Sequence, residues 1–211
     1  MTELSASLAR TPLYRLSKNL DARMTEFSGW EMPVQYSGIG REHQAVRSTA
    51  GMFDISHMGK FRLRGRNVLE QLQALVPSDL SGLQPGEAQY TVLLNQKAGI
   101  IDDLIFYYQG LDDRGEQRWV AIVNAATTLK DKTWLLDHLD TQQLEFEDES
   151  KAYVLLAVQG PEAVQQLQAF VAEDLSEIKP FGHLEGTVLG QSGFLARTGY
   201  TGEDGFEVMV N

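Results

Sequence analysis

Two adjacent aspartates, Asp102 and Asp103, stand in an otherwise apolar stretch that has the composition of a strand. Consecutive residues of a strand point to opposite faces, so the two carboxyl groups are not expected to act as a catalytic pair. At least one of them faces the interior or a cleft, where an ionised acid needs a partner. That group is a candidate proton acceptor or cation binder. In the alternative interpretation both aspartates lie at the start of the strand and accept hydrogen bonds from backbone amides in a turn.

The segment 199–207, GYTGEDGFE, has the highest density of residues that could form a binding site. Its three glycines permit positive φ and close backbone approach. The segment could be a tight hairpin and nothing more. However, Glu207 is an acid on an otherwise apolar strand, where it could accept hydrogen bonds from the ring N–H and exocyclic amine of an amino-pyrimidine. The spacing is not that of a phosphate-binding loop, and the acids of the segment would repel phosphate.

Three tyrosines, Tyr90, Tyr107 and Tyr200, lie in or beside expected strands. Tyrosines that line a cleft offer a flat apolar surface with one polar tip, which suits an aromatic heterocycle. Taken singly, a tyrosine in such a place is more often a residue at the edge of the core.

The four histidines give no metal-site pattern, because no two of them have ligand spacing on one helix. His57 follows Asp54 and a serine, which invites comparison with a hydrolase triad. No nucleophile elbow of the form G-x-S-x-G accompanies them, so the triad interpretation is not favoured. His57 is expected instead to be a hydrogen-bonded residue in a turn.

Helices and strands alternate irregularly along the chain, and several strands are joined as hairpins, which indicates an α+β fold. Thr11 and Pro12 are expected to cap and begin the first helix. The polar run 142–151 is expected to be a linker between substructures. The further expected helices cover 38–49, 68–76 and 129–139 and begin after Gln159; the expected strands lie near 27–34, at the end of 52–65, and over 89–94, 100–108, 118–123, 152–158, 195–198 and 206–210.

Composition excludes several classes of protein. A hydrophobic share of 43% is enough for a sizeable core, and the absence of cysteine excludes disulfides, thiolate zinc sites and a cysteine nucleophile. The net charge of −11 disfavours binding to nucleic acid. The first residues, which include Glu3, resemble neither a signal peptide nor a transit peptide, and no apolar run reaches membrane-spanning length. A cytoplasmic protein is expected.

An ordered set of short motifs resembles the folate-dependent aminomethyltransferase family, that is, the N-terminal part of the T protein of the glycine cleavage system. Each motif is weak alone, but the set runs along almost the whole chain at family spacing. The motifs are TPLY from Thr11, FSGWEMPVQY from Phe27, Glu42-His43, GMFDISHMG from Gly51, GIIDDLI from Gly99, LAVQGP from Leu156 and RTGYTGEDGFE from Arg197.

The resemblance implies a reaction in which tetrahydrofolate accepts the one-carbon unit of an aminomethyl group carried on the dihydrolipoyl arm of the H protein, with release of ammonia in glycine catabolism. Tetrahydrofolate is a co-substrate, and no metal is expected. The family's catalytic aspartate maps to Asp103, with Asp102 facing the other way, although the choice between the two stays open. The implied folate-binding residues are Met58, Tyr90, Tyr107, Asn124, Tyr200 and Glu207.

The resemblance also implies a discontinuous first subdomain, residues 1–57 plus 150–211, and an inserted α+β subdomain, residues 58–149. A C-terminal β-barrel domain and a folate-contacting arginine of the family lie outside these 211 residues. Asn211 directly follows an apolar strand, which we interpret as a sign of truncation. The chain by itself is therefore expected to bind folate weakly, to show little or no activity, and to expose apolar surface that favours self-association.

Two other assignments stay open. The chain could be a related folate-binding domain of a sarcosine- or dimethylglycine-oxidising enzyme, although no G-x-G-x-x-G fingerprint of a fused flavin domain is present. It could also be an inactive fragment that retains only carrier docking. The iron–sulfur assembly branch of the superfamily is disfavoured, because its cysteine-containing motif is replaced here by RTGYTGED from Arg197.

Overall fold

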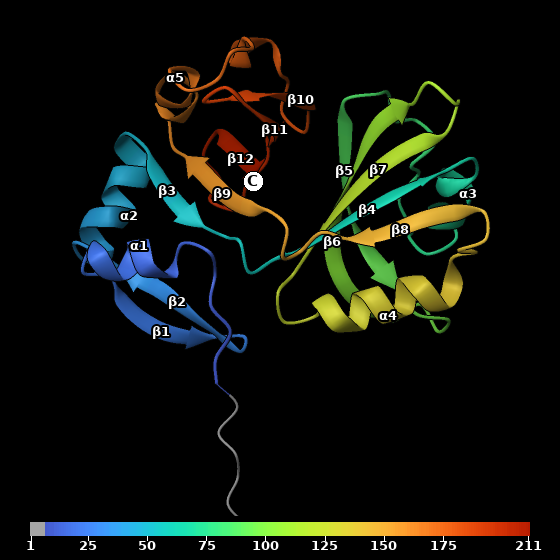
Figure 1. Cartoon of the computed structure of the whole chain (residues 1–211), viewed down its shortest axis with the longest axis horizontal. Helices are drawn as coiled ribbons and strands as arrows, with labels where there is room; N and C mark the ends of the chain where they lie inside the picture. Colours follow the sequence, from blue (N-terminus) through green and yellow to red (C-terminus); the bar gives the residue numbers. More distant parts are fainter. Residues whose placement is uncertain (1–6) are drawn as a thin grey trace, which may run out of the picture.

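A computed structural model describes residues 7–211, so Glu3 and the N-terminal residues used to judge a leader peptide lie outside the described part. The chain forms two antiparallel five-stranded sheets and a small N-terminal hairpin (Figure 1). This arrangement of antiparallel sheets with flanking helices confirms the expected α+β class. Within residues 7–211, no helix is both long enough and apolar enough to cross a bilayer.

The first five-stranded sheet has the order β5-β6-β7-β4-β8 and carries two helices on one face. Apolar side chains of that face pack against the helices in a core that includes Phe61, Leu104, Trp119 and Leu135. The elements are β4 (Gly59–Gly65), α3 (Val68–Gln73), β5 (Glu87–Leu94), β6 (Ile100–Leu111), β7 (Gln117–Val123), α4 (Thr128–His138) and β8 (Leu144–Asp148).

The second five-stranded sheet has the order β10-β11-β12-β9-β3, and one face is covered by α5 and a short 3-10 helix. Its core on that face includes Leu175, Leu195 and Phe206. The elements are β3 (Gly51–Asp54), β9 (Val154–Gln159), α5 (Ala163–Gln168), η1 (Leu175–Glu177), β10 (His183–Val188), β11 (Gln191–Ala196) and β12 (Gly205–Val210).

The N-terminal elements pack beside β3 and leave an apolar groove of about 820 Å³. Its exposed lining includes Phe27, Ile39 and Met52. The elements are α1 (Tyr14–Asn19), β1 (Arg23–Phe27), β2 (Trp30–Gln35) and α2 (Ile39–Ser48).

The other faces of the two large sheets meet in a shared core. Ile105 and Tyr107 of β6 pack there with Phe194 of β11 and Met209 of β12. Since alternate residues of a strand share a face, Asp103 lies on the same side of β6 as Ile105 and Tyr107, and Glu207 on the same side of β12 as Met209. The strand alternation thus directs both acids toward the space between the sheets.

The chain passes between the sheets twice, at residues 55–58 and 149–153, and the two passages lie side by side. The amide of Ile55 donates to the carbonyl of Leu155 at 3.0 Å. The fully buried Lys60 donates from Nζ to the carbonyls of Ser56 at 2.9 Å and Met58 at 2.8 Å. Burial lowers the pKa of Lys60 to about 8. These bonds fix the position of Met58.

The predicted cap of the first helix is wrong. The helix begins at Tyr14 after Leu13, which makes no side-chain capping bond. The hydroxyl of Thr11 instead donates to Asp54 Oδ2 at 2.6 Å. A carboxylate is a stronger acceptor than the helix end offers, so the threonine ties the N-terminal segment to β3.

The predicted linker 142–151 is also wrong, because it contains β8, which pairs with β4 along five residues. The run is polar because β8 is the edge strand of its sheet, and several of its side chains face solvent. Two smaller differences occur later: α5 begins at Ala163, four residues after Gln159, and β10 was not predicted.

Candidate functional site

Asp103 lies beside two of the other candidate residues. The hydroxyl of Tyr90 donates to Asp103 Oδ2 at 2.8 Å, and Asn124 Nδ2 donates to Asp103 Oδ1 at 3.3 Å. Tyr90 comes from the neighbouring strand β5, and Asn124 follows the end of β7. Asp103 is half-buried and Tyr90 is 45% exposed, so this carboxyl group is accessible from outside.

Asp102 is buried on the opposite face of β6. It accepts hydrogen bonds from Thr127 Oγ1 at 2.7 Å, from Asn124 Nδ2 at 3.0 Å and from the backbone amide of Asn124 at 3.3 Å. The two neighbouring aspartates therefore differ in role: the environment of Asp102 is closed by protein donors, whereas Asp103 is open to a ligand.

Glu207 is 3% exposed and has one satisfied and one unsatisfied oxygen. Its Oε2 accepts hydrogen bonds from Thr198 Oγ1 at 2.5 Å and from the hydroxyl of Tyr107 at 3.2 Å. Its Oε1 is buried without a hydrogen-bonding partner among the described residues. Burial raises the pKa of Glu207. A buried acceptor without a donor is costly, so Oε1 marks a place where a ligand donor would be favourable.

The glycine-rich segment is held by Gln159, which is 1% exposed at the end of β9. Gln159 Nε2 donates to the carbonyl of Thr198 at 3.0 Å, and Gln159 Oε1 accepts from the hydroxyl of Thr201 at 2.8 Å. Between these two anchors lies Tyr200, which is 58% exposed. Partial burial and the nearby carboxylates of Glu207 and Asp103 raise the pKa of Tyr200. Tyr200 therefore lies within electrostatic reach of both acids.

Gly199 is required by this packing, because a Cβ there would lie 1.9 Å from Gln159 Oε1. Gln159 cannot yield without losing both of its hydrogen bonds. We expect Gly199→Ala to lower the free energy of unfolding by about 1–3 kcal/mol. Urea denaturation measures this, with Gly82→Ala as the control, since a Cβ on Gly82 would meet no atom within 4 Å. Equal stability of the two variants would contradict the proposed packing.

The structure thus places five of the seven candidate residues in two clusters, and Met58 and Tyr200 belong to neither. Tyr90, Asp103 and Asn124 form one cluster, and Tyr107 and Glu207 form the other. Met58 packs in the same intersheet core as Tyr107. It is 7% exposed, so little of its side chain is accessible to a ligand. No three His, Asp or Glu side chains of residues 7–211 gather as a metal site would require.

Sequence reasoning missed Thr198 and Gln159, which orient Glu207 and the glycine-rich segment. Thr198 lies directly before Gly199, but nothing in its type or spacing distinguishes it from a surface threonine. Gln159 is adjacent to Gly160, and the sequence predicts only that it precedes a helix. Their roles depend on contacts between strands that are distant in the sequence.

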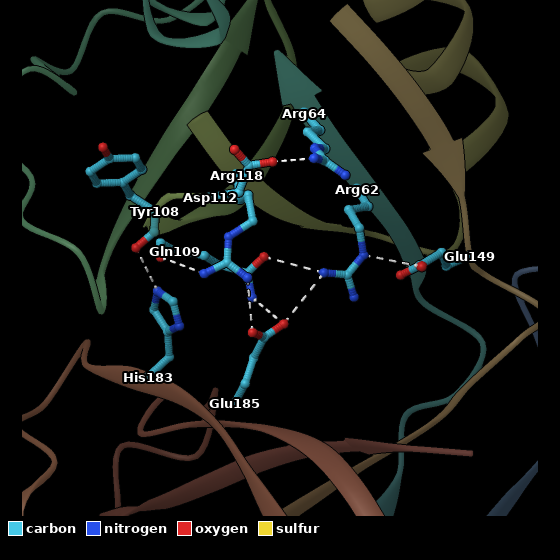
Figure 2. A network of polar contacts seen from close by, with 9 residues as sticks. All are labelled: Arg62, Arg64, Tyr108, Gln109, Asp112, Arg118, Glu149, His183 and Glu185. Atoms are coloured by element: carbon cyan, nitrogen blue, oxygen red, sulfur yellow. Dashed lines mark hydrogen bonds and ion pairs between the residues drawn. The ribbon is translucent and has the colours of Figure 1, made fainter. Parts of the chain in front are cut away.

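A network of charges also joins the two sheets. Figure 2 shows Glu185 of β10 between Arg62 and Arg118 of the first sheet. Glu185 accepts from Arg118 Nη1 and from Gln109 Nε2, each at 3.0 Å, and lies 3.6 Å from Arg62 Nη1. This network links the sheets that carry Asp103 and Glu207.

The protein is thus of the α+β class, with two sheets and with acidic side chains that are directed into the space between them. The family model described as "GCVT N-terminal domain" matches residues 13–211. The chain belongs to this family, as the motifs indicated.

Named relatives agree with this membership. An aminomethyltransferase of a Nostoc species is 66% identical over 209 residues, which is 99% of this chain and 56% of that protein. The solved glycine cleavage system aminomethyltransferase T from Bartonella henselae is 34% identical, with a TM-score of 0.86 over 97% of this chain and 54% of that one. The chain therefore spans about half the length of these relatives.

A more distant structure shares the fold alone. The heterotetrameric sarcosine oxidase from a Corynebacterium species matches with a TM-score of 0.54 at 16% identity, over 80% of each chain. At this identity the similarity supports the architecture and carries no inference on activity.

Proposed function

We propose that this chain supplies the larger part of the tetrahydrofolate site of a glycine cleavage aminomethyltransferase. The observation that carries the proposal is the buried Oε1 of Glu207, which has no donor among the described residues. The names of the Nostoc and Bartonella relatives support it. In the proposed reaction the one-carbon unit passes from the aminomethyl group on the dihydrolipoyl arm of the H protein to tetrahydrofolate, and ammonia leaves.

Glu207 would hold the amino-pyrimidine edge of the pterin. The ring N–H and the exocyclic amine of that edge form a pair of donors that a carboxylate can accept in a fork-like geometry. Thr198 and Tyr107 hold Oε2, so the orientation of the carboxylate is set before the ligand arrives. This preorganisation lowers the entropic cost of binding.

Asp103 would orient the folate and stabilise the positive charge that develops as its nitrogen attacks the methylene carbon. The hydroxyl of Tyr90 and the side chain of Asn124 fix the carboxyl group for this role. The aromatic rings of Tyr90 and Tyr200, with Met58 deeper in the core, would line the pterin and its linker.

The proposal includes the H protein as carrier, a cytoplasmic location, and the division into residues 1–57 plus 150–211 and residues 58–149. The two crossings of the chain between the sheets support this division. The folate contacts supplied by the rest of the longer protein would complete the site, so binding by this chain alone should be weak.

Calorimetric titration with tetrahydrofolate tests the proposal. We expect weak saturable binding to this chain, and tighter binding to a version extended by the downstream sequence of its relatives. Absence of binding to the chain alone would assign an indispensable share of the site to the downstream part. Absence of binding to the extended protein as well would contradict the folate assignment.

A further inference from the structure

Asp131, in the first turn of α4, is a fully buried acid that the proposed reaction does not use. Neither of its carboxyl oxygens has a hydrogen-bond donor among the described residues. An ionised carboxylate in such a place would lose its hydration without compensation. The geometry is therefore that of a neutral carboxylic acid, which is itself a donor.

The carboxyl group of Asp102 on β6, against which α4 packs, contributes to the raised pKa of Asp131 and is the acceptor that such a donor would meet. Asp102 already accepts three hydrogen bonds, from Thr127 Oγ1 and from the side-chain and backbone nitrogens of Asn124. Of the two carboxyl groups, Asp102 thus has the donors that a hydrogen-bond acceptor needs, and Asp131 has none. The proton belongs on Asp131.

Few other charges bear on this pair. Burial, followed by the hydrogen bond to Asp102, raises the pKa of Asp131 to about 7. Thr127 and the charge of Lys130 oppose this shift more weakly. Lys130 is directed to the surface of β6, where its Nζ donates to the carbonyl of Ile101 at 2.5 Å.

We propose that Asp131 carries a proton in the folded protein and donates it in a hydrogen bond to Asp102, so that the pair positions Asn124 beside Asp103. Asn124 Nδ2 is shared by Asp102 Oδ1 and the carbonyl of Asp103, both at 3.0 Å, and lies 3.3 Å from Asp103 Oδ1. Asp131 is therefore a positioning residue. Its importance for catalysis rests on the proposed function, whereas the bound proton does not.

The bound proton links stability to pH. The carboxyl pKa in the unfolded chain is about 3.9, and in the folded protein it is about 7. Because the folded state binds the proton more tightly, its stabilising effect is complete below the unfolded value and is lost as pH rises toward and through about 7. Asp131→Asn keeps a neutral donor of the same shape at every pH, so it removes this loss.

Urea denaturation at pH values from about 5 to about 8 tests the proton. For the parent we expect the urea midpoint to fall by roughly 0.5–1 M more over this range than for Asp131→Asn. Asp137→Asn, at an exposed position of the same helix, should follow the parent. Parallel curves for the parent and Asp131→Asn would overturn the proposal.

Nuclear magnetic resonance of the parent gives a second test that does not depend on the variants folding. The carboxyl carbon of Asp131 should titrate with a midpoint near 7. The side-chain amide of Asn124 should shift with the same midpoint in the parent and in Asp137→Asn. A carboxyl midpoint below about 5 would overturn the bound proton, and an Asn124 amide that stays fixed while Asp131 titrates would overturn the positioning role.

Discussion

Asp103→Asn is expected to lower the turnover of the extended protein by about 10²–10⁴-fold, the range that a general acid–base or charge-stabilising group supplies. The amide has the shape of the carboxyl group and can keep its contacts with Tyr90 and Asn124. It has no negative charge to stabilise the cation that forms at the folate nitrogen. Tetrahydrofolate affinity should therefore change little, because the effect lies in the transition state.

Single-turnover kinetics with loaded H protein, together with calorimetry, would separate these two quantities. Asp113→Asn, at an exposed position between β6 and β7, is the matched control and should behave as the parent. Equal losses of turnover and of affinity in Asp103→Asn would assign to Asp103 a role in ground-state binding instead. Unchanged turnover would remove it from the reaction.

Glu207→Gln is expected to weaken tetrahydrofolate binding by roughly 10–100-fold, which corresponds to the loss of a hydrogen bond to a charged group. The amide can still accept through one oxygen from Thr198 and Tyr107, but its nitrogen then meets the pterin donors with a donor of its own. Calorimetry on the extended protein measures the change. Glu145→Gln, at an exposed position of β8, is the control.

The stability of Glu207→Gln distinguishes lost recognition from lost folding. Burial raises the pKa of Glu207 in the folded state. Its contribution to stability is therefore present below the unfolded pKa and is lost as pH rises through the folded value. Because glutamine has no proton to lose, this variant should be at least as stable as the parent once pH exceeds the raised pKa of Glu207. Parental affinity in a folded Glu207→Gln variant would contradict the proposed contact.

Period-two alternation was enough to predict most of the sheets and to separate the neighbouring acids of β6. Asp102 and Asp103 lie within a strand whose apolar residues occupy both faces, so their side chains must diverge. That the two carboxyl groups face opposite sides of the sheet needs only local geometry, which a sequence contains, whereas the burial of Asp102 depends on Thr127 and Asn124. The same holds for the β5–β6 hairpin, whose turn residues 95–99 mark the reversal.

The sequence could not reveal contacts that form across the fold. Thr11 has the features of a helix cap, yet a carboxylate 43 residues away competes successfully for its hydroxyl. The sequence of β8 predicts a linker because an edge strand can be almost wholly polar. The unpartnered oxygen of Glu207 depends on the positions of Tyr107, in the first sheet, and of Thr198, which follows β11 of the second sheet.

The adjacency of the two chain crossings has a consequence for how such a protein could change over evolutionary time. Lys60, at the start of the first sheet, binds through its amide to Ser150 Oγ at 3.1 Å, just after that sheet ends. A stretch of gene encoding residues 59–148 therefore begins and ends at nearly one point in space. Recombination could exchange such a stretch while disturbing the host polypeptide at that single point, as tolerated insertions require. The half of the site that carries Asp103 could thus diversify independently of the half that carries Glu207.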